Sequence, residues 1–354
     1  MRFSFCKKIL KRRTACQVCS CLIFFLVKIT PVSAQDTEKV EWLQQFCQPG
    51  LEGMTPGKGL VFEHSNTPRF RISSVSDVEG LEPATDNVEN YRRVKLKMRF
   101  PLWLSDGLKV IGGFRYEQEE MIFQRAGHIS QGIHNNLKSS HLKVAGGEIN
   151  VLKPFIGNKY FVFRGAVRYS GQFKKLRGIS SDYMTYNLSA LYGIKKNSNT
   201  ELGFGINFNN GFGFASIYPV MLYNHNFNDK WGIEALLPKQ VKLRRNLPGN
   251  NIFALNVELE GGRYLLPEVQ LSATETGPLT MEMAEIKTGI SFQRPLIAFL
   301  WFGMEAGYRK NLNLGFVRPH TNRNDNIIRS DLTSGIFANI SLFVTPPKSL
   351  SKKK

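Results

Sequence analysis

The chain has 354 residues, of which 42% are hydrophobic and 12% aromatic, and its 47 Lys and Arg against 28 Asp and Glu give a net charge of +19. The mean hydropathy of -0.22, with no apolar stretch of about 18 residues after the N-terminal region, excludes a helical membrane protein. The aromatic content excludes a disordered chain. Two classes of protein remain possible: a basic soluble protein, and a protein whose apolar residues are spread evenly along the chain.

Residues 1–34 have the order of a secretory signal peptide. Seven cationic and no acidic side chains accompany the apolar run Leu22–Val27, and small residues end the segment at Val32–Ala34. We expect cleavage after residue 34, the alternative being a retained membrane anchor. Cleavage leaves 40 cationic against 28 acidic residues, a net charge of +12, and leaves Cys47 as the single cysteine. No intramolecular disulfide is then available to the exported chain.

Residues 35–58 precede the first expected strand and contain Trp42, Phe46 and Cys47. The sequence is compatible with a short plug, a periplasmic helix or a disordered leader.

From about residue 91 onward, apolar and polar residues alternate with a period of two. In residues 93–100, Val94, Leu96, Met98 and Phe100 alternate with four cations. The same alternation recurs over residues 108–117, 161–169, 184–194, 202–208, 298–309 and 335–344. Such a period is typical of strands with two chemically different faces, and no segment after residue 60 has a comparable helical period.

Strand length and aromatic placement favour a membrane barrel over a soluble sandwich. The alternating segments run about 9–15 residues, which exceeds the usual five or six and suits a tilted bilayer crossing. Aromatic residues gather near the expected strand ends, as the belts of a barrel in lipid do. These residues are Trp103, Tyr160, Tyr183, Trp231, Tyr264 and Trp301. We predict an all-β fold, an antiparallel transmembrane β-barrel over residues 59–345.

The number of strands follows from the alternation of short periplasmic turns with longer outer loops. This alternation holds along the chain only if residues 231–247 form two strands that meet at Pro238-Lys239, and if residues 59–75 supply a first strand. The total is then 14 strands, and 12 without these two steps. Long loops are expected near residues 265–280 and 310–330. The last strand is predicted at Leu332–Val344, and residues 346–354 form a basic C-terminal tail.

Two segments resemble a known family of proteins. The segment Tyr223–Pro238, with Leu255–Tyr264 in support, resembles uncharacterised porin-like outer-membrane barrels known only as a domain of unknown function. The resemblance covers roughly residues 60–345. It implies a Gram-negative outer-membrane β-barrel, with outer-membrane lipids and the barrel-assembly machinery as partners, and it brings no known substrate. Barrels of this kind usually end on an aromatic residue, whereas Phe343 lies 11 residues from the end of this chain.

No catalytic, cofactor or metal site is predicted, and we expect a protein that is not an enzyme. His128 and Ser130 have the spacing of a base and a hydroxyl on one strand face, as in outer-membrane phospholipases, but they fall in an expected outer loop without a third orienting group. We interpret Glu117, Glu119 and Glu120 as a charged strand end rather than a Ca²⁺ site. Nucleic-acid binding is not expected, because no recognition fold accompanies the basic residues.

The polar strand faces predict a charged barrel lumen. The expected lumen-lining residues are Arg93, Lys95, Lys97, Arg99, Lys109, Arg115, Arg164, Arg168, Lys242, Arg244, Glu258, Glu260, Lys287, Glu305 and Arg309. Four cations in one row, Arg93 to Arg99, repel one another unless carboxylates or anions lie opposite. Either the lumen is an open pore that prefers anions, or neighbouring strands supply carboxylates that close it.

We therefore expect an outer-membrane barrel for porin-like passage of small solutes, with an anion preference. The alternatives are a closed structural or surface-binding barrel without channel activity, and a barrel enzyme that acts on lipids.

Overall fold

The computed structural model describes residues 50–77, 83–124, 132–173, 180–211, 216–271, 275–319 and 326–345. The chain divides into two units, residues 1–40 and 41–354, and the described residues belong to the second. The predicted signal peptide 1–34, most of the leader 35–58 and the tail 346–354 lie outside the described residues and stay predictions.

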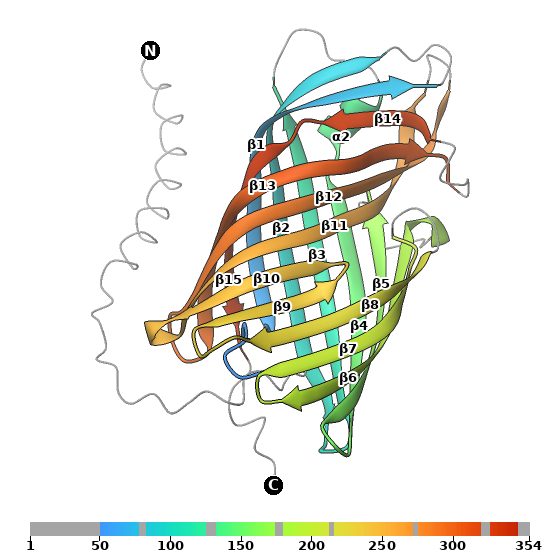
Figure 1. Cartoon of the computed structure of the whole chain (residues 1–354). Helices are drawn as coiled ribbons and strands as arrows, with labels where there is room; N and C mark the ends of the chain where they lie inside the picture. The colour runs from blue at the N-terminus through green and yellow to red at the C-terminus, as the bar shows by residue number, and fades with distance from the viewer. Residues whose placement is uncertain are drawn as a thin grey trace, which may run out of the picture. The chain divides into compact units, whose positions relative to one another are not determined.

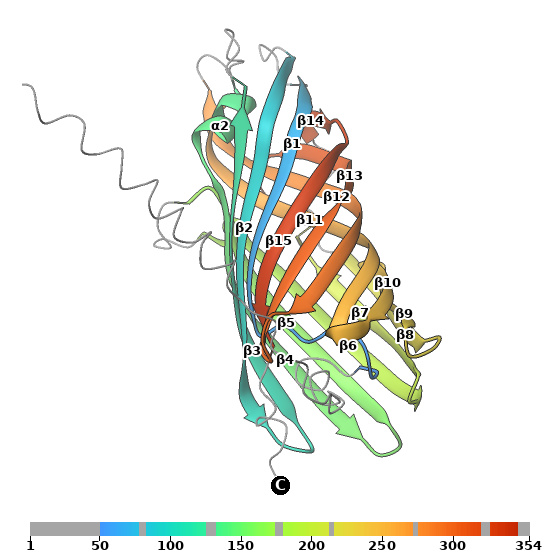
Figure 2. The same ribbon diagram turned by 90° about the vertical axis from the view of Figure 1, so that its left-hand side faces the viewer.

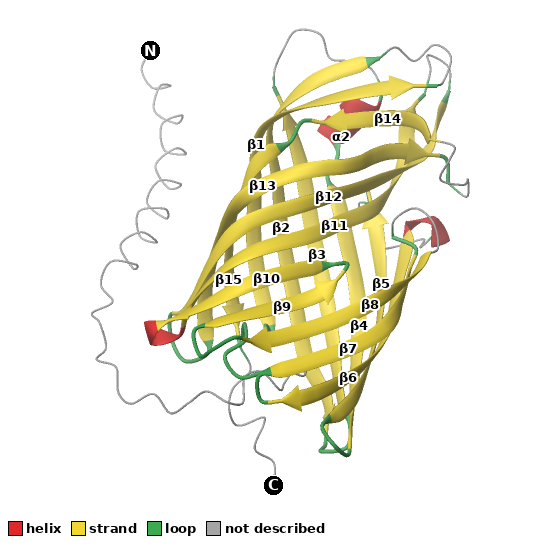
Figure 3. Ribbon diagram, viewed as in Figure 1, coloured by secondary structure: helices red, strands yellow, loops and turns green. Residues whose placement is uncertain are grey.

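The described chain is almost entirely antiparallel sheet (Figures 1 and 3). The strands are β1 (Leu60–Ser76), β2 (Ala84–Leu104), β3 (Lys109–Phe123), β4 (Leu142–Phe155), β5 (Lys159–Gly171), β6 (Met184–Asn197), β7 (Thr200–Asn209), β8 (Ser216–Asn226), β9 (Trp231–Leu237), β10 (Gln240–Leu247), β11 (Asn251–Gln270), β12 (Thr276–Pro295), β13 (Leu300–Val317), β14 (Asn326–Leu332) and β15 (Gly335–Val344). One short helix, α2 (Ile133–Ser139), and two 3-10 turns, η1 (Ser181–Tyr183) and η2 (Pro248–Asn250), complete the described elements.

Alternating residues of each strand point to opposite sides of the sheet. On β6, Tyr186, Leu188 and Tyr192 are exposed on the outside, while Thr185 is buried. The exposed apolar side chains continue around the ring on β2, β7, β12 and β15. A barrel in lipid requires an apolar exterior with polar residues behind it. It also requires that every backbone group be paired within the wall.

The sheet closes into a ring. Each strand from β1 to β13 pairs antiparallel with the next, and β14 and β15 both lie between β13 and β1. Ile72 of β1 pairs with Leu332 of β14, and Leu60 of β1 pairs with Val344 of β15. Because β14 and β15 occupy one place in the ring, the barrel has 14 strand positions, as predicted. Its last strand, expected at Leu332–Val344, is continued upstream by β14.

Both of the steps that the loop alternation required are present. The first strand is β1, and residues 231–247 form two strands, β9 and β10, which turn at Pro238-Lys239. The expected long loops near 265–280 and 310–330 are wrong in extent, since β11 runs to Gln270 and β13 to Val317. Their outer ends stay paired with β12, as far as Gln270 on β11 and Val317 on β13.

The barrel narrows toward the end where the longer connections lie. The hairpin β9–β10 stops at Leu237–Gln240, and beyond it β5 meets β11 directly through Leu265 and Gly171. The Gln172 backbone N–H donates to the Leu265 carbonyl at 2.9 Å. The wall at this outer end is therefore formed by β1–β5, β11–β13 and β14, without β6–β10 (Figure 2). This ring of nine strands is close to the eight-stranded size whose interior only side chains fill, whereas the full ring is wider.

Within the described part of the chain, no helix has the length and apolar character needed to cross a membrane.

Candidate functional site in the barrel interior

The Arg93–Arg99 ladder lies on the buried face of β2, and neighbouring strands supply carboxylates to it. The register between β2 and β3 sets Arg93 opposite Glu119 and Lys95 opposite Glu117. The Lys95 ammonium also lies 2.9 Å from Glu63 of β1. The cations therefore do not form an isolated row, because carboxylates from both adjacent strands lie between them.

Three cations and three carboxylates form a layer that we call the balanced layer. Its members are Arg93, Lys287, Arg309, Glu119, Glu260 and Glu285. Arg93 contacts Glu260 at 3.0 Å and Glu285 at 3.6 Å, and Lys287 contacts Glu260 at 2.6 Å. The charges cancel within the layer, so it offers no net attraction to an anion.

A second layer, the cationic layer, lies nearer the short turns and carries excess positive charge. Glu148 contacts Arg164 at 2.5 Å, Arg99 at 2.6 Å and Lys97 at 3.8 Å. One carboxylate therefore serves three cations. Arg168 makes no ion pair with a carboxylate in the portion of the chain that the structure describes. The side chains of Lys97, Arg99 and Arg164 keep 14–23% of their surface exposed, which leaves them in contact with solvent.

A third group joins the predicted N-terminal leader to the barrel. The Arg244 guanidinium lies 3.0 Å from Glu234, and Lys242 lies at 4.0 Å from the same carboxylate. The Thr55 backbone N–H donates to Glu234 at 2.9 Å, and the Asn226 amide donates to the Glu52 carbonyl at 2.8 Å. Residues 50–58 are thus held against β8 and β9, whereas the assignment of residues 35–58 as a plug stays a prediction.

The remaining predicted lining residues do not join these layers. Among the described residues, Glu258 forms an ion pair only with Lys239, at 4.0 Å, and both are substantially exposed beside the β9–β10 turn. The Asn256 amide donates to Glu305 at 2.9 Å. Arg115 pairs with Glu117 at 2.6 Å, next to the cationic layer. Lys109 begins β3 at the short-turn end and makes no ion pair with the described carboxylates.

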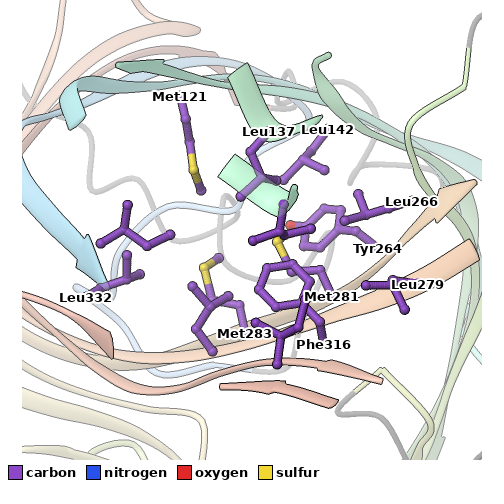
Figure 4. Close-up of a cluster of buried hydrophobic side chains, with 14 of the residues drawn as sticks. Met121, Leu137, Leu142, Tyr264, Leu266, Leu279, Met281, Met283, Phe316 and Leu332 are labelled. Atoms are coloured by element: carbon purple, nitrogen blue, oxygen red, sulfur yellow. The ribbon is translucent and has the colours of Figure 1, made fainter. Parts of the chain in front are cut away.

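The narrow outer end is filled by apolar side chains, which we call the apolar plug. It includes Leu137 of α2, Met121 of β3, Tyr264 of β11, Met281 of β12 and Phe316 of β13, which lie close together in Figure 4. Met281 and Phe316 are completely buried. The Arg309 guanidinium lies 4.6 Å from the centre of the Phe70 ring, where the plug meets the balanced layer. The plug separates the charged interior from the outer loops.

Helix α2 is anchored to the wall by a chain of polar contacts. The His134 Nε2 atom lies 2.7 Å from Ser74 Oγ on β1, and its Nδ1 atom lies 2.5 Å from Asp86 Oδ2 on β2. Ser74 Oγ also lies 2.5 Å from Ser330 Oγ on β14. Both Ser74 and His134 are buried, and the imidazole stacks on Phe123. The Asn136 amide adds a donor to the Glu268 carbonyl at 2.6 Å.

Sequence reasoning missed this constellation. The base and hydroxyl that it considered, His128 and Ser130, lie outside the described residues. Helix α2 was not predicted, because it is only seven residues long and too short for a helical period to show. Ser74 and His134 are 60 residues apart in sequence, so no local spacing connects them. Among the described residues, no group of three or more His, Cys, Asp or Glu could hold a metal ion.

The fold and its interior define the class of this protein. A closed antiparallel ring with an apolar exterior and a charged interior is an outer-membrane β-barrel. Residues 159–316, from β5 into β13, match the family model described as "Domain of unknown function (DUF6268)". Both segments that carry the sequence resemblance lie inside this match, which is shorter than the expected range of 60–345. No curated protein matches the chain.

Solved structures of outer-membrane proteins are similar to the chain at low identity. The Pseudomonas putida toluene transporter TodX is 9% identical with a TM-score of 0.34, and the alignment covers 87% of this chain and 98% of TodX. A Pseudomonas aeruginosa FadL homologue is 7% identical with a TM-score of 0.34, covering 88% and 98%. LpxR from Salmonella typhimurium is 9% identical with a TM-score of 0.30, covering 78% and 99%. Similarities this weak transfer no activity to the present chain.

Proposed function

We propose that this barrel passes small anionic solutes across the outer membrane and is closed at its outer end by the apolar plug. The observation that carries the proposal is the charge imbalance of the cationic layer, in which Glu148 alone serves Lys97, Arg99 and Arg164. Charged linings bias which ions enter a pore. The partly exposed cations favour anions. We therefore assign the predicted anion preference to the cationic layer alone.

The balanced layer and the plug limit the passage. The balanced layer has no net charge, and Met281 and Phe316 in the plug are completely buried. Solutes reach the cationic layer from the short-turn end in this state. Passage to the outer side requires displacement of α2 and rearrangement of the side chains around it.

The remaining expectations belong to the same proposal. The chain is exported with a cleaved signal peptide at residues 1–34, is inserted by the barrel-assembly machinery, and contacts outer-membrane lipids through its apolar exterior. The longer connections, including the one that holds α2, face the outside, because short turns are periplasmic in outer-membrane barrels.

Ion current through the purified protein in a planar bilayer tests the proposal. We define an unplugged variant in which residues 133–139 are replaced by seven Gly and Ser residues and Met281 and Phe316 are replaced by Ala. The wild type should give rare or no openings, and the unplugged variant should give steady current whose reversal potential in a salt gradient indicates an anion preference. Arg164→Glu in the unplugged variant should shift that potential toward cations.

A closed barrel without channel activity is the second candidate. It is favoured by the complete burial of the plug and by the paired charges of the balanced layer. An unplugged variant that retains heat-modifiable migration on a gel yet carries no current would establish this candidate and exclude passage.

A further inference from the structure

The contacts of His134 have the geometry of a nucleophile, a base and an orienting carboxylate. Ser74 Oγ is 2.7 Å from Nε2, and Asp86 Oδ2 is 2.5 Å from Nδ1. Serine hydrolases on unrelated folds share this arrangement, which is recognised by geometry and roles rather than by sequence order. The three residues come from β1, α2 and β2, and they meet only because α2 folds back into the barrel.

The order of donors and acceptors along the trio suits proton abstraction from Ser74. The Asp86 carboxylate only accepts, so the Nδ1–H group donates a hydrogen bond to it and Nε2 is left as an acceptor. The Ser74 hydroxyl then donates to Nε2, and the Ser330 hydroxyl, 2.5 Å away, donates to Ser74 Oγ. Each contact in this order is satisfied. We propose that Ser74, His134 and Asp86 form a hydrolytic site that cleaves carboxylic esters with an apolar acyl chain.

The surroundings of Ser74 specify the acyl part of the ester. Ile72 on the same face of β1 is fully buried, and Ile328 and Leu332 flank Ser330 on β14. Phe123 covers the imidazole of His134. These surroundings are apolar and match an acyl chain that enters when α2 moves aside, whereas a charged group would be buried without a partner. Asp86 retains 22% side-chain exposure, so the trio reaches the solvent on its carboxylate side.

The reaction follows from these positions. Ser74 Oγ forms a bond to the ester carbonyl carbon while its proton passes to Nε2 of His134. The bond from that carbon to the alkoxy oxygen breaks, and His134 returns the proton to the departing alcohol. Water, deprotonated by His134, then attacks the acyl carbon, Ser74 leaves with the proton, and a carboxylic acid is released. The Ser330 hydroxyl is placed to donate to the carbonyl oxygen as it gains negative charge.

A fluorescent fluorophosphonate tests the site on the full chain in detergent micelles. Wild type should be labelled covalently, and Ser74→Ala should abolish labelling. His134→Gln and Asp86→Asn should slow it by about 10²–10⁴-fold. Ser73→Ala is the matched control, because Ser73 directly precedes Ser74 on β1 and lies on the opposite face. There its hydroxyl accepts a hydrogen bond from Thr85. It should label like the wild type.

Hydrolysis assays separate two sources of the ester. A p-nitrophenyl octanoate assay reports a free ester, and release of fatty acid from phospholipid in mixed micelles reports a lipid. Either activity, lost in Ser74→Ala, supports the site. Folded wild type that neither labels nor hydrolyses either ester would overturn the proposal, and the trio would then only anchor α2.

A cysteine variant keeps the test decisive if Ser74→Ala does not fold. In a Cys47→Ser background, Ser74→Cys should react with iodoacetamide at least tenfold faster than Ser73→Cys, and the added His134→Gln change should remove the difference. Equal rates for the two cysteines would contradict an activating role of His134. This inference does not depend on passage through the barrel.

Discussion

Glu148 is the carboxylate on which three cations of the cationic layer converge, at 2.5–3.8 Å. Its side chain is only 6% exposed. Removing one partner of such a buried group leaves uncompensated charges behind, and this loss exceeds the net value of the contacts themselves.

Glu148→Gln is therefore expected to lower the free energy of unfolding by about 3–5 kcal/mol. The measurement is guanidinium unfolding in detergent, followed by gel migration. Glu258→Gln is the control, because its pair with Lys239 is exposed and worth about 0–1 kcal/mol. Equal effects of the two changes would mean that solvent screens the cationic layer completely.

Gly193 shows a second constraint at the residue scale. A Cβ atom there would lie 2.0 Å from Cζ of Tyr160, whose ring is buried and whose hydroxyl donates to Glu201 at 2.9 Å. The Asn224 amide donates to the same carboxylate at 2.6 Å. The glycine provides the space in which this ring lies across the neighbouring strand.

Gly193→Ala should cost about 1–3 kcal/mol, because the ring cannot move without losing its hydrogen bond. Thermal or guanidinium unfolding measures the change. At Gly107 a Cβ would meet nothing within 4 Å, so Gly107→Ala should have little effect. A stability of Gly193→Ala equal to that of the wild type would show that Tyr160 has room to shift.

At the scale of single elements, the cost of placing a charge on the exterior should depend on depth in the membrane more than on the exposure of the position. Ile206 of β7 and Val75 of β1 are 59% and 58% exposed, yet Ile206 lies among apolar exterior residues and Val75 lies beyond them at the outer end. Arg71 and Ser73, on the same exterior face of β1, mark that end as polar. The two positions therefore form a matched pair.

Ile206→Arg should destabilise the barrel by about 2–4 kcal/mol and Val75→Arg by about 0–1 kcal/mol. Equilibrium unfolding from lipid vesicles measures both. A similar cost at both positions would contradict the assignment of the outer end to water.

The elements also show which features could be predicted from the sequence. The period of two predicted the strands, and loop alternation predicted the turn at Pro238-Lys239 and hence 14 strands. Helix α2 could not be predicted, because seven residues with one buried face give too short a pattern. The early end of β9 and β10, which narrows the barrel, depends on a contact between Gly171 and Leu265 that no local pattern contains.

Whether the lumen is open or closed by paired charges could not be predicted from the sequence either. Arg93 and Glu260 are 167 residues apart, so their 3.0 Å contact depends on how the ring closes. The sequence showed that the cations lie on one face of a strand, but not which strands lie across from them. Pairing between β2 and β3, by contrast, follows from a short hairpin, and the register of that hairpin sets Glu117 and Glu119 opposite the ladder.

At the scale of the whole molecule, the barrel combines two interiors. The wide part carries charged layers, and the narrow outer part carries an apolar plug with α2 inside it. The apparent excess of basic residues is partly neutralised in the balanced layer and persists in the cationic layer. The ring has fewer strands at its outer end, because β6–β10 stop before it. This difference explains the two kinds of interior, since the narrower ring has no room for solvated charges.

Cysteine accessibility in intact cells tests the sealed outer end most directly. In a Cys47→Ser background, Lys97→Cys places a thiol in the cationic layer, and a charged, membrane-impermeant maleimide is added from outside. Val75→Cys, at the outer end, should be labelled in every background. We predict no labelling of Lys97→Cys while the plug is intact and clear labelling in the unplugged variant. Labelling with the plug intact, or none in either form, would contradict a passage closed by the plug.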